Sequence, residues 1–210
     1  MARLPLAGAL GVMAPPVAAT LVLAGGWMTP GYDPFTRTIS RLSMPGAAGG
    51  LAVEVAIVLV GGALVALAVA LGPGLRVGRA LLVVAAGGLL VAAAIRLDPA
   101  SVSATAGHRL ATMLAMLALA GAPFAFWSYG RMSFAFGAAE VGMLLVGLAL
   151  LPTTFAAWGA WERCFLVLPM AWMLVLSWRL LRAEGSSLTI SVSTDDTMKA
   201  AAASRSSSGS

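Results

Sequence analysis

Four side chains in this sequence could together support acid–base chemistry. His108 is the single histidine, and imidazole is the side chain that exchanges a proton near neutral pH. The carboxylates of Asp98 and Glu162 could assist it, and the hydroxyl of Ser40 could complete the set. Because the chain has one histidine and one cysteine, Cys164, a three-histidine zinc site, a bis-histidine haem and a multi-cysteine metal site are excluded. We therefore expect no metal and no cofactor.

Arginines close to these residues could bind an anion. Arg37 and Arg41 are four residues apart, and two like charges at this helical spacing cost roughly 0.2–0.5 kcal/mol unless they are compensated. Lipid phosphates could compensate them, and so could the carboxylates of Asp33 and Glu54. The alternative is an anionic ligand head held by a group of arginines. These are Arg37, Arg41, Arg96 and Arg109.

The stretch GYDPFTRTISRLSMPG, residues 31–46, is a polar segment in a chain that is 60% hydrophobic and 10% charged. Phe35, Ile39 and Leu42 are spaced at i, i+4 and i+7, which places them on one face of a helix. The residues on another face are Arg37, Ser40 and Arg41. We predict a short amphipathic helix at the bilayer surface, lying over the end of the membrane helices.

The composition of the chain is that of a membrane protein. Its 210 residues have a mean hydropathy of +0.95, and a soluble domain needs more polar surface than 10% charged residues supply. About 20 helical residues cross a hydrocarbon core of roughly 30 Å. We predict an all-α fold, a polytopic transmembrane bundle of six helices with a short interfacial helix after the first. The six apolar runs are Leu6–Trp27, Leu51–Leu71, Ala80–Ile95, Gly107–Trp127, Met132–Leu151 and Arg163–Leu181.

The two ends of the chain raise separate questions. The first run could be a signal peptide because Arg3 precedes it, but Pro15 and Pro16 in its middle favour a spanning helix with a proline kink. Residues 183–210 are rich in serine and lack a long apolar run. We predict a disordered cytoplasmic tail there, after a transmembrane domain of residues 1–182. This tail is either passive or a site of phosphorylation or partner binding.

The distribution of basic residues predicts the topology. Six crossings put both termini on one side of the membrane. That side carries eight Lys and Arg residues, or six without Lys199 and Arg205 of the tail, against five on the other side. We therefore expect both termini in the cytoplasm. The formal net charge of +5 comes from basic residues that flank apolar runs, so we expect no nucleic-acid partner.

Three connections on the side away from the termini share a pattern. Each follows an odd-numbered helix and has a proline, then Ser or Thr, then glycine, and each leads to a titratable residue near the start of the next helix. Asp33 and Asp98 precede prolines in the first two, and both are expected to start short helical turns. A helical hairpin used three times would gather the titratable residues at one polar mouth. These residues are Glu54, His108, Glu162 and Arg163.

Charged residues at this mouth need partners. Glu54 could pair with Arg37 or Arg41. Glu162 and Arg163 are neighbours that point about 100° apart on a helix, so we expect one of them to meet a partner in the second connection. The expected partners are Arg96, Asp98 and His108.

Glu140 lies inside the fifth run, where a charged side chain costs on the order of 2.5–3.5 kcal/mol. We expect it to face the interior of the bundle or to be protonated. Pro15 and Pro16 lie at similar depth in the first run, and the carbonyls they free could accept a hydrogen bond from a protonated Glu140. Glu140 is either a structural residue or part of a proton or cation relay.

Three segments carry a family resemblance: YDPFTRTISRL after the first run, RLDPASVSATAGHRL between the third and fourth, and WERCFLVLPMAWMLVLSWRL in the sixth. They resemble a bacterial family of six-helix membrane proteins, the domain-of-unknown-function family numbered nine-nine-eight. The resemblance covers Leu6 to Arg182 and implies a fold and a bacterial plasma-membrane location, but no reaction. The second segment has Arg96-Leu97 where that family usually has Phe-Pro. The positions that match the family's motifs are Asp33, Ser40, Asp98, His108, Glu162 and Arg163.

Two functions are compatible with these residues. We favour a non-enzymatic or accessory protein that holds an amphiphile, a lipid or a partner at an extracytoplasmic polar mouth, because the sequence has no complete catalytic set. The alternative is a membrane-embedded enzyme or a proton-coupled carrier that uses His108 and neighbouring carboxylates. A polar path from Glu140 to His108 would favour the carrier, and an apolar seal would favour the binding protein. The expected partners are membrane lipids and a small amphiphilic or anionic ligand.

Overall fold

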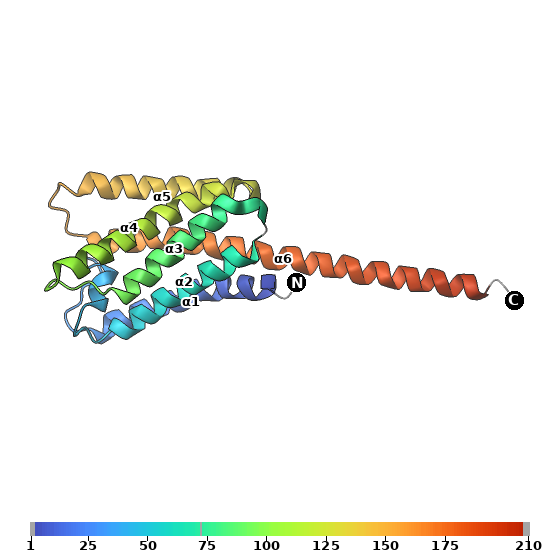
Figure 1. Ribbon diagram of the computed structural model, residues 1–210, viewed down its shortest axis with the longest axis horizontal. Helices are drawn as coiled ribbons and strands as arrows, with labels where there is room; N and C mark the ends of the chain where they lie inside the picture. Colours follow the sequence, from blue (N-terminus) through green and yellow to red (C-terminus); the bar gives the residue numbers. More distant parts are fainter. Residues whose placement is uncertain (1–2, 72, 208–210) are drawn as a thin grey trace.

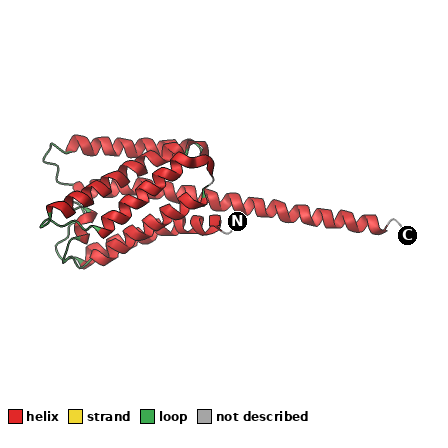
Figure 2. Cartoon of the chain, in the orientation of Figure 1, coloured by secondary structure: helices red, strands yellow, loops and turns green. Residues whose placement is uncertain are grey.

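The computed structural model describes residues 3–71 and 73–207, and every regular element in these ranges is a helix (Figure 2). The six long helices are α1 (Arg3–Met28), α2 (Gly50–Ala70), α3 (Arg76–Ala94), α4 (Val102–Ala125), α5 (Arg131–Leu150) and α6 (Trp158–Ser207). The three short 3-10 helices are η1 (Ile39–Ser43), η2 (Pro73–Leu75) and η3 (Trp127–Tyr129).

All six long helices contain a segment that is long and apolar enough to cross a membrane. The predicted six-helix transmembrane bundle is therefore confirmed. The fourth helix starts at Val102, earlier than predicted, because the Ser101 hydroxyl accepts a hydrogen bond from the Ala104 N–H (3.2 Å) and caps it. With about 3.6 residues per turn, His108 lies nearly two turns inside α4 and does not open it.

The long helices form a closed bundle. Each packs against the helix that follows it in the sequence, and α6 also packs against α1. Figure 1 shows the N-terminus and the departing part of α6 at one end of the bundle. The α1–α2, α3–α4 and α5–α6 connections lie at the opposite end, which we call the polar end. The interior is filled mostly by alanine and leucine, with a few buried rings such as Phe126, Phe165 and Trp172.

The last helix extends past the bundle. Its spanning part is Trp158–Arg182, and α6 continues to Ser207 (Figure 1). The division of the chain into a transmembrane domain and a disordered tail of residues 183–210 rests on composition and stays a prediction. Its last residues, 208–210, lie outside the described part of the chain.

Two glycine pairs record how closely the helices approach. A Cβ on Gly88 of α3 would lie 2.6 Å from the Ala111 carbonyl oxygen of α4, whereas a Cβ on Gly87 would have nothing within 4 Å. In α2, a Cβ on Gly61 would touch α3, and one on Gly62 would again meet open space. One glycine of each pair therefore lies at a helix contact, as small residues do in membrane bundles.

We predict that Gly88→Ala destabilises the bundle and that Gly87→Ala does not. Both substitutions lie inside the same helix, so the change in helix propensity is the same. The methyl group at position 88 would overlap the backbone of α4, and overpacking of this kind costs about 1–3 kcal/mol. Thermal unfolding of both variants in one detergent measures the difference. Equal unfolding temperatures would contradict the close contact of α3 with α4.

Candidate functional site

The α1–α2 connection lies over the polar end, where η1 contacts α1, α2 and α6. The predicted short helix after the first is present, but its predicted apolar face is wrong. Thr38 is extended, with ψ at 155°, so the turn after Asp33 and the helix η1 are separate. Phe35 is 61% exposed and Leu42 is 0% exposed, because the extended residue breaks the helical spacing between them.

Asp33 and Asp98 both start short turns, as predicted. The Asp33 carboxylate accepts hydrogen bonds from the Phe35 N–H (2.9 Å) and the Thr36 hydroxyl (2.7 Å). The Asp98 carboxylate accepts one from the Ala100 N–H (2.9 Å). The hydrogen bond from Thr36, followed by the one from Phe35, holds the pKa of Asp33 below its usual value. Each carboxylate thus accepts hydrogen bonds from residues of the connection that contains it.

Glu162, in the first turns of α6, holds η1 in place. The residue is 6% exposed, and its Oε2 accepts a hydrogen bond from the backbone N–H of Ile39 at 2.5 Å. Ile39 is the first residue of η1, where a helix has backbone donors without partners in the helix. A charged acceptor forms a stronger hydrogen bond with such a donor than a neutral one does.

Arg163 binds the same connection through its guanidinium group. Nη1 donates to the carbonyl oxygens of Pro34 (2.7 Å) and Arg37 (3.2 Å), and Nη2 donates to the Tyr32 hydroxyl (2.5 Å). A side chain larger than hydrogen at position 159 would overlap the same two carbonyls, so Gly159 allows α6 to approach. The start of α6 and the α1–α2 connection are therefore joined mainly through backbone groups.

The prediction that Glu162 or Arg163 meets a partner in the second connection is wrong. The predicted partners were Arg96, Asp98 and His108. Both residues bind the first connection, because α6 packs beside α1 and contacts η1.

Tyr32 is a site residue that was not predicted from the sequence. Burial raises the pKa of Tyr32, and the hydrogen bond from Arg163 opposes that rise. A tyrosine next to a charged connection usually needs a polar partner for its hydroxyl, and this pattern in the sequence could have identified Tyr32.

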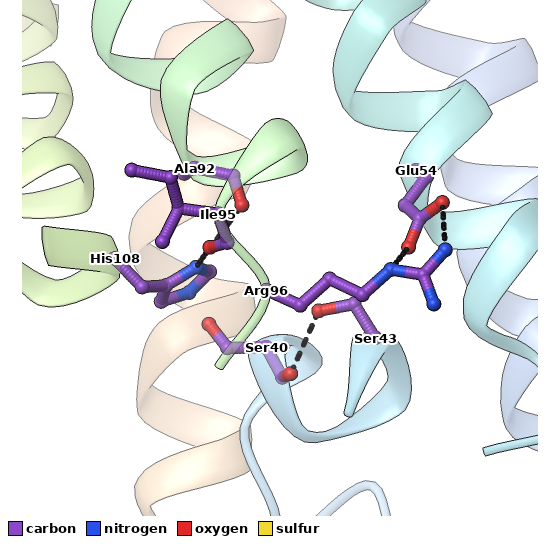
Figure 3. Close-up of polar contacts among 7 residues, drawn as sticks. All are labelled: Ser40, Ser43, Glu54, Ala92, Ile95, Arg96 and His108. Atoms are coloured by element: carbon purple, nitrogen blue, oxygen red, sulfur yellow. Dashed lines mark hydrogen bonds and ion pairs between the residues drawn. The ribbon is translucent and has the colours of Figure 1, made fainter. Parts of the chain in front are cut away.

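Glu54 forms an ion pair with Arg96, not with Arg37 or Arg41 as predicted. The Arg96 Nε lies 2.5 Å from Oε1, and its Nη2 donates to Oε2 at 2.9 Å (Figure 3). Arg96 follows α3, and α3 packs directly against the α2 helix that carries Glu54. The Arg96 side chain is 51% exposed, so the pair contributes no more than about 1 kcal/mol. It does occupy Arg96, which had been a candidate for binding an anion.

His108 is buried at the polar end, where it is 3% exposed. Its Nδ1 lies 3.0 Å from the Ala92 carbonyl oxygen and 2.8 Å from the Ile95 carbonyl oxygen (Figure 3). Carbonyl oxygens only accept hydrogen bonds, so Nδ1 carries the hydrogen. The last carbonyls of a helix have no partner within the helix, and His108 supplies a donor at the end of α3.

The other ring nitrogen of His108, Nε2, is buried and has no hydrogen-bond partner among the described residues. In the view of Figure 3, Ser40 of η1 lies on the side of this imidazole that faces away from the end of α3. The Ser40 carbonyl accepts a hydrogen bond from the Ser43 hydroxyl (2.9 Å), and the Ser40 hydroxyl is turned toward His108. Two candidates that are distant in the sequence, Ser40 and His108, therefore both belong to the polar end, with the Ser40 hydroxyl directed toward the imidazole.

Besides the paired Arg96, three arginines of the polar end are exposed. Arg37 and Arg41 belong to the α1–α2 connection, and Arg109 belongs to α4. Arg41 directly follows Ser40 in the chain, and Arg109 directly follows His108. An exposed arginine thus directly follows both Ser40 and His108 in the chain.

Glu140 faces the bundle, as predicted, and is 0% exposed. Neither of its carboxyl oxygens has a hydrogen-bond partner among the described residues. The proposed partner, a carbonyl freed by Pro15 or Pro16 of α1, is wrong, because α5 packs against α4 and α6.

Contacts on either side of Glu140 give its depth in the bundle. Ser133 accepts a hydrogen bond from the Trp172 indole (3.3 Å), and Gly147 packs against Trp161. Position 140 is midway between positions 133 and 147 in α5, so Glu140 lies between the levels of the two tryptophans. Trp161 separates it from the polar end along α6.

A bundle of six spanning helices with short connections defines a multi-pass integral membrane protein. The chain belongs to the family described as a protein of unknown function, DUF998, which matches residues 12–179. Those residues include all the polar-end side chains described above. Comparisons with curated proteins and with solved structures gave no match. The resemblance noted from the sequence is confirmed, and the expectations of no cofactor, no metal and no nucleic-acid partner stay predictions.

We predict that Glu162→Ala loosens η1 and that Glu162→Gln keeps most of its order. The alanine variant leaves the half-buried Ile39 N–H without an acceptor, which costs about 1 kcal/mol, whereas glutamine retains a carbonyl oxygen. Hydrogen exchange of residues 38–43 measures the effect, and Asp98→Ala, in the second connection, is the control. Equal exchange in the parent and both Glu162 variants would show that Glu162 does not hold η1.

Proposed function

We propose that the protein is an accessory or binding protein of a plasma membrane, and that its polar end binds the anionic head group of an amphiphile. In this proposal both termini lie in the cytoplasm and the polar end faces the other side. The single observation that carries it is the exposure of Arg37, Arg41 and Arg109 at an end whose carboxylates already have partners within the chain.

The carboxylates of the polar end have partners within the chain. Asp33 and Asp98 accept hydrogen bonds within their own turns, Glu54 pairs with Arg96, and Glu162 accepts from the Ile39 N–H. Asp33 is close enough to Arg37 for their charges to interact, but Arg37, Arg41 and Arg109 form no ion pair with the described residues. A cation near a membrane surface attracts an anionic lipid by about 1 kcal/mol, and several exposed arginines at one end add their effects.

The apolar packing between Glu140 and the polar end supports a binding protein over a carrier. Trp161 stacks on Phe165 with 5.7 Å between ring centroids, and Phe165 is 0% exposed. These rings lie on α6 between the level of Glu140 and the polar end. A proton-coupled carrier would need a polar path there, and aromatic rings do not provide one.

A membrane-embedded enzyme or carrier that uses His108 is the second candidate, and the buried, unpartnered Nε2 favours it. General acid–base catalysis usually relies on an imidazole oriented by a carboxylate or another polar group. Here backbone carbonyls orient His108, and the carboxylates of Glu162 and Asp98 bind elsewhere. This arrangement favours binding over proton transfer.

Lipid retention tests the proposed function. We predict that the protein purified in detergent retains phosphatidylglycerol in preference to phosphatidylcholine, and that Arg37→Gln with Arg41→Gln lowers this retention by about fivefold for each arginine. Native mass spectrometry counts the bound lipids. The matched control is Arg76→Gln with Arg131→Gln, which removes two exposed arginines from the opposite end. An equal loss in both double variants, or no preference in the parent, would contradict the proposal.

A further inference from the structure

One ring nitrogen of His108 has no hydrogen-bond partner among the described residues. A buried polar atom without a hydrogen bond destabilises a protein, and such atoms are rare in folded proteins. Nε2 of His108 is in this position, in a residue that is 3% exposed. The cost is removed when a hydrogen-bonding group of a ligand reaches the nitrogen.

The hydrogen bonds of the other ring nitrogen determine what kind of group Nε2 accepts. Nδ1 carries the hydrogen because both of its neighbours, at Ala92 and Ile95, are carbonyl oxygens. In the neutral ring Nε2 therefore has a free lone pair and acts as an acceptor. Its natural partner is an O–H or N–H donor, and a bare phosphate oxygen has no hydrogen to give.

Ser40 supplies the second contact. Figure 3 shows its hydroxyl turned toward His108 from η1. The position of Ser40 is fixed from both sides, since Glu162 binds the preceding residue, Ile39, and Ser43 donates to the Ser40 carbonyl. A ligand hydroxyl can donate to Nε2 and accept from the Ser40 hydroxyl at the same time.

We propose that Ser40 and His108 form a binding site for a free hydroxyl group of an anionic amphiphile whose head group is a glycerol phosphate. The proposal rests on the proposed function and adds the chemical class of the ligand. The exposed Arg41 and Arg109, each next in sequence to one of these residues, supply positive charge for the phosphate. The hydroxyl is the part of the head group that Ser40 and His108 recognise.

Two lipids of equal charge separate recognition of the hydroxyl from attraction of the phosphate. Phosphatidylglycerol and phosphatidylethanol both carry one negative charge, but only phosphatidylglycerol has free hydroxyls. In an equimolar mixture the parent protein should retain phosphatidylglycerol in about fivefold excess, the factor that one or two hydrogen bonds supply. Native mass spectrometry measures both lipids in one spectrum.

The variants assign this preference to the two side chains. Ser40→Ala removes one contact, and His108→Asn removes Nε2 while its amide N–H can still donate to the carbonyls at the end of α3. Either variant should retain the two lipids equally, and Ser128→Ala, an exposed serine at the opposite end, should keep the excess. If His108→Asn does not fold, Ser40→Ala carries the test alone.

Each outcome separates this inference from the proposed function. Equal retention of the two anionic lipids by the parent, both above phosphatidylcholine, overturns the hydroxyl site and leaves the proposed function standing. No preference for either anionic lipid overturns both. Loss of the bound lipid on adding soluble glycerol 3-phosphate supports the site and assigns it to a soluble ligand, whereas retention of the lipid assigns the site to the membrane.

Discussion

Backbone groups at the ends of helices need hydrogen-bond partners, and the polar end of this bundle depends on side chains that supply them. Glu162 accepts from the N–H of Ile39, Arg163 donates to the carbonyls of Pro34 and Arg37, and His108 donates to a carbonyl at the end of α3. An unsatisfied backbone group costs several kcal/mol near a membrane, where little water is available to replace a lost partner. These contacts seat the first two connections on the bundle.

This use of polar side chains decides which of them remain available to a ligand. Most of the charged residues that looked like binding candidates are engaged within the chain, as the Glu54–Arg96 pair and the turn at Asp33 illustrate. What remains is the exposed face of a few arginines and one buried imidazole nitrogen. The same packing that fixes η1 against α6 also directs the Ser40 hydroxyl toward His108, so the stability of the polar end and the proposed ligand site depend on the same contacts.

The sequence predicts local features well and long-range partners poorly. Six apolar runs predict six spanning helices because the membrane requires about 20 apolar residues for each crossing. Asp33 starts a turn because a carboxylate next to proline binds nearby N–H groups, and this depends on neighbouring residues alone. The partners of Glu54 and Glu162 depend instead on which helices are adjacent, and the sequence does not encode that order in any short pattern. The early start of α4 followed from the Ser101 cap, a local signal that the low hydropathy of residues 102–107 obscured.

The protonation state of His108 tests the hydrogen bonding of the polar end most directly. His108 is the single histidine, so ¹⁵N NMR of the protein labelled at histidine and placed in nanodiscs reports on one imidazole. The bonds to the Ala92 and Ile95 carbonyls predict that, in the neutral ring, Nδ1 carries the hydrogen and Nε2 has a free lone pair. A ring protonated at Nε2 and bare at Nδ1 would contradict both the cap on α3 and the acceptor site beside Ser40.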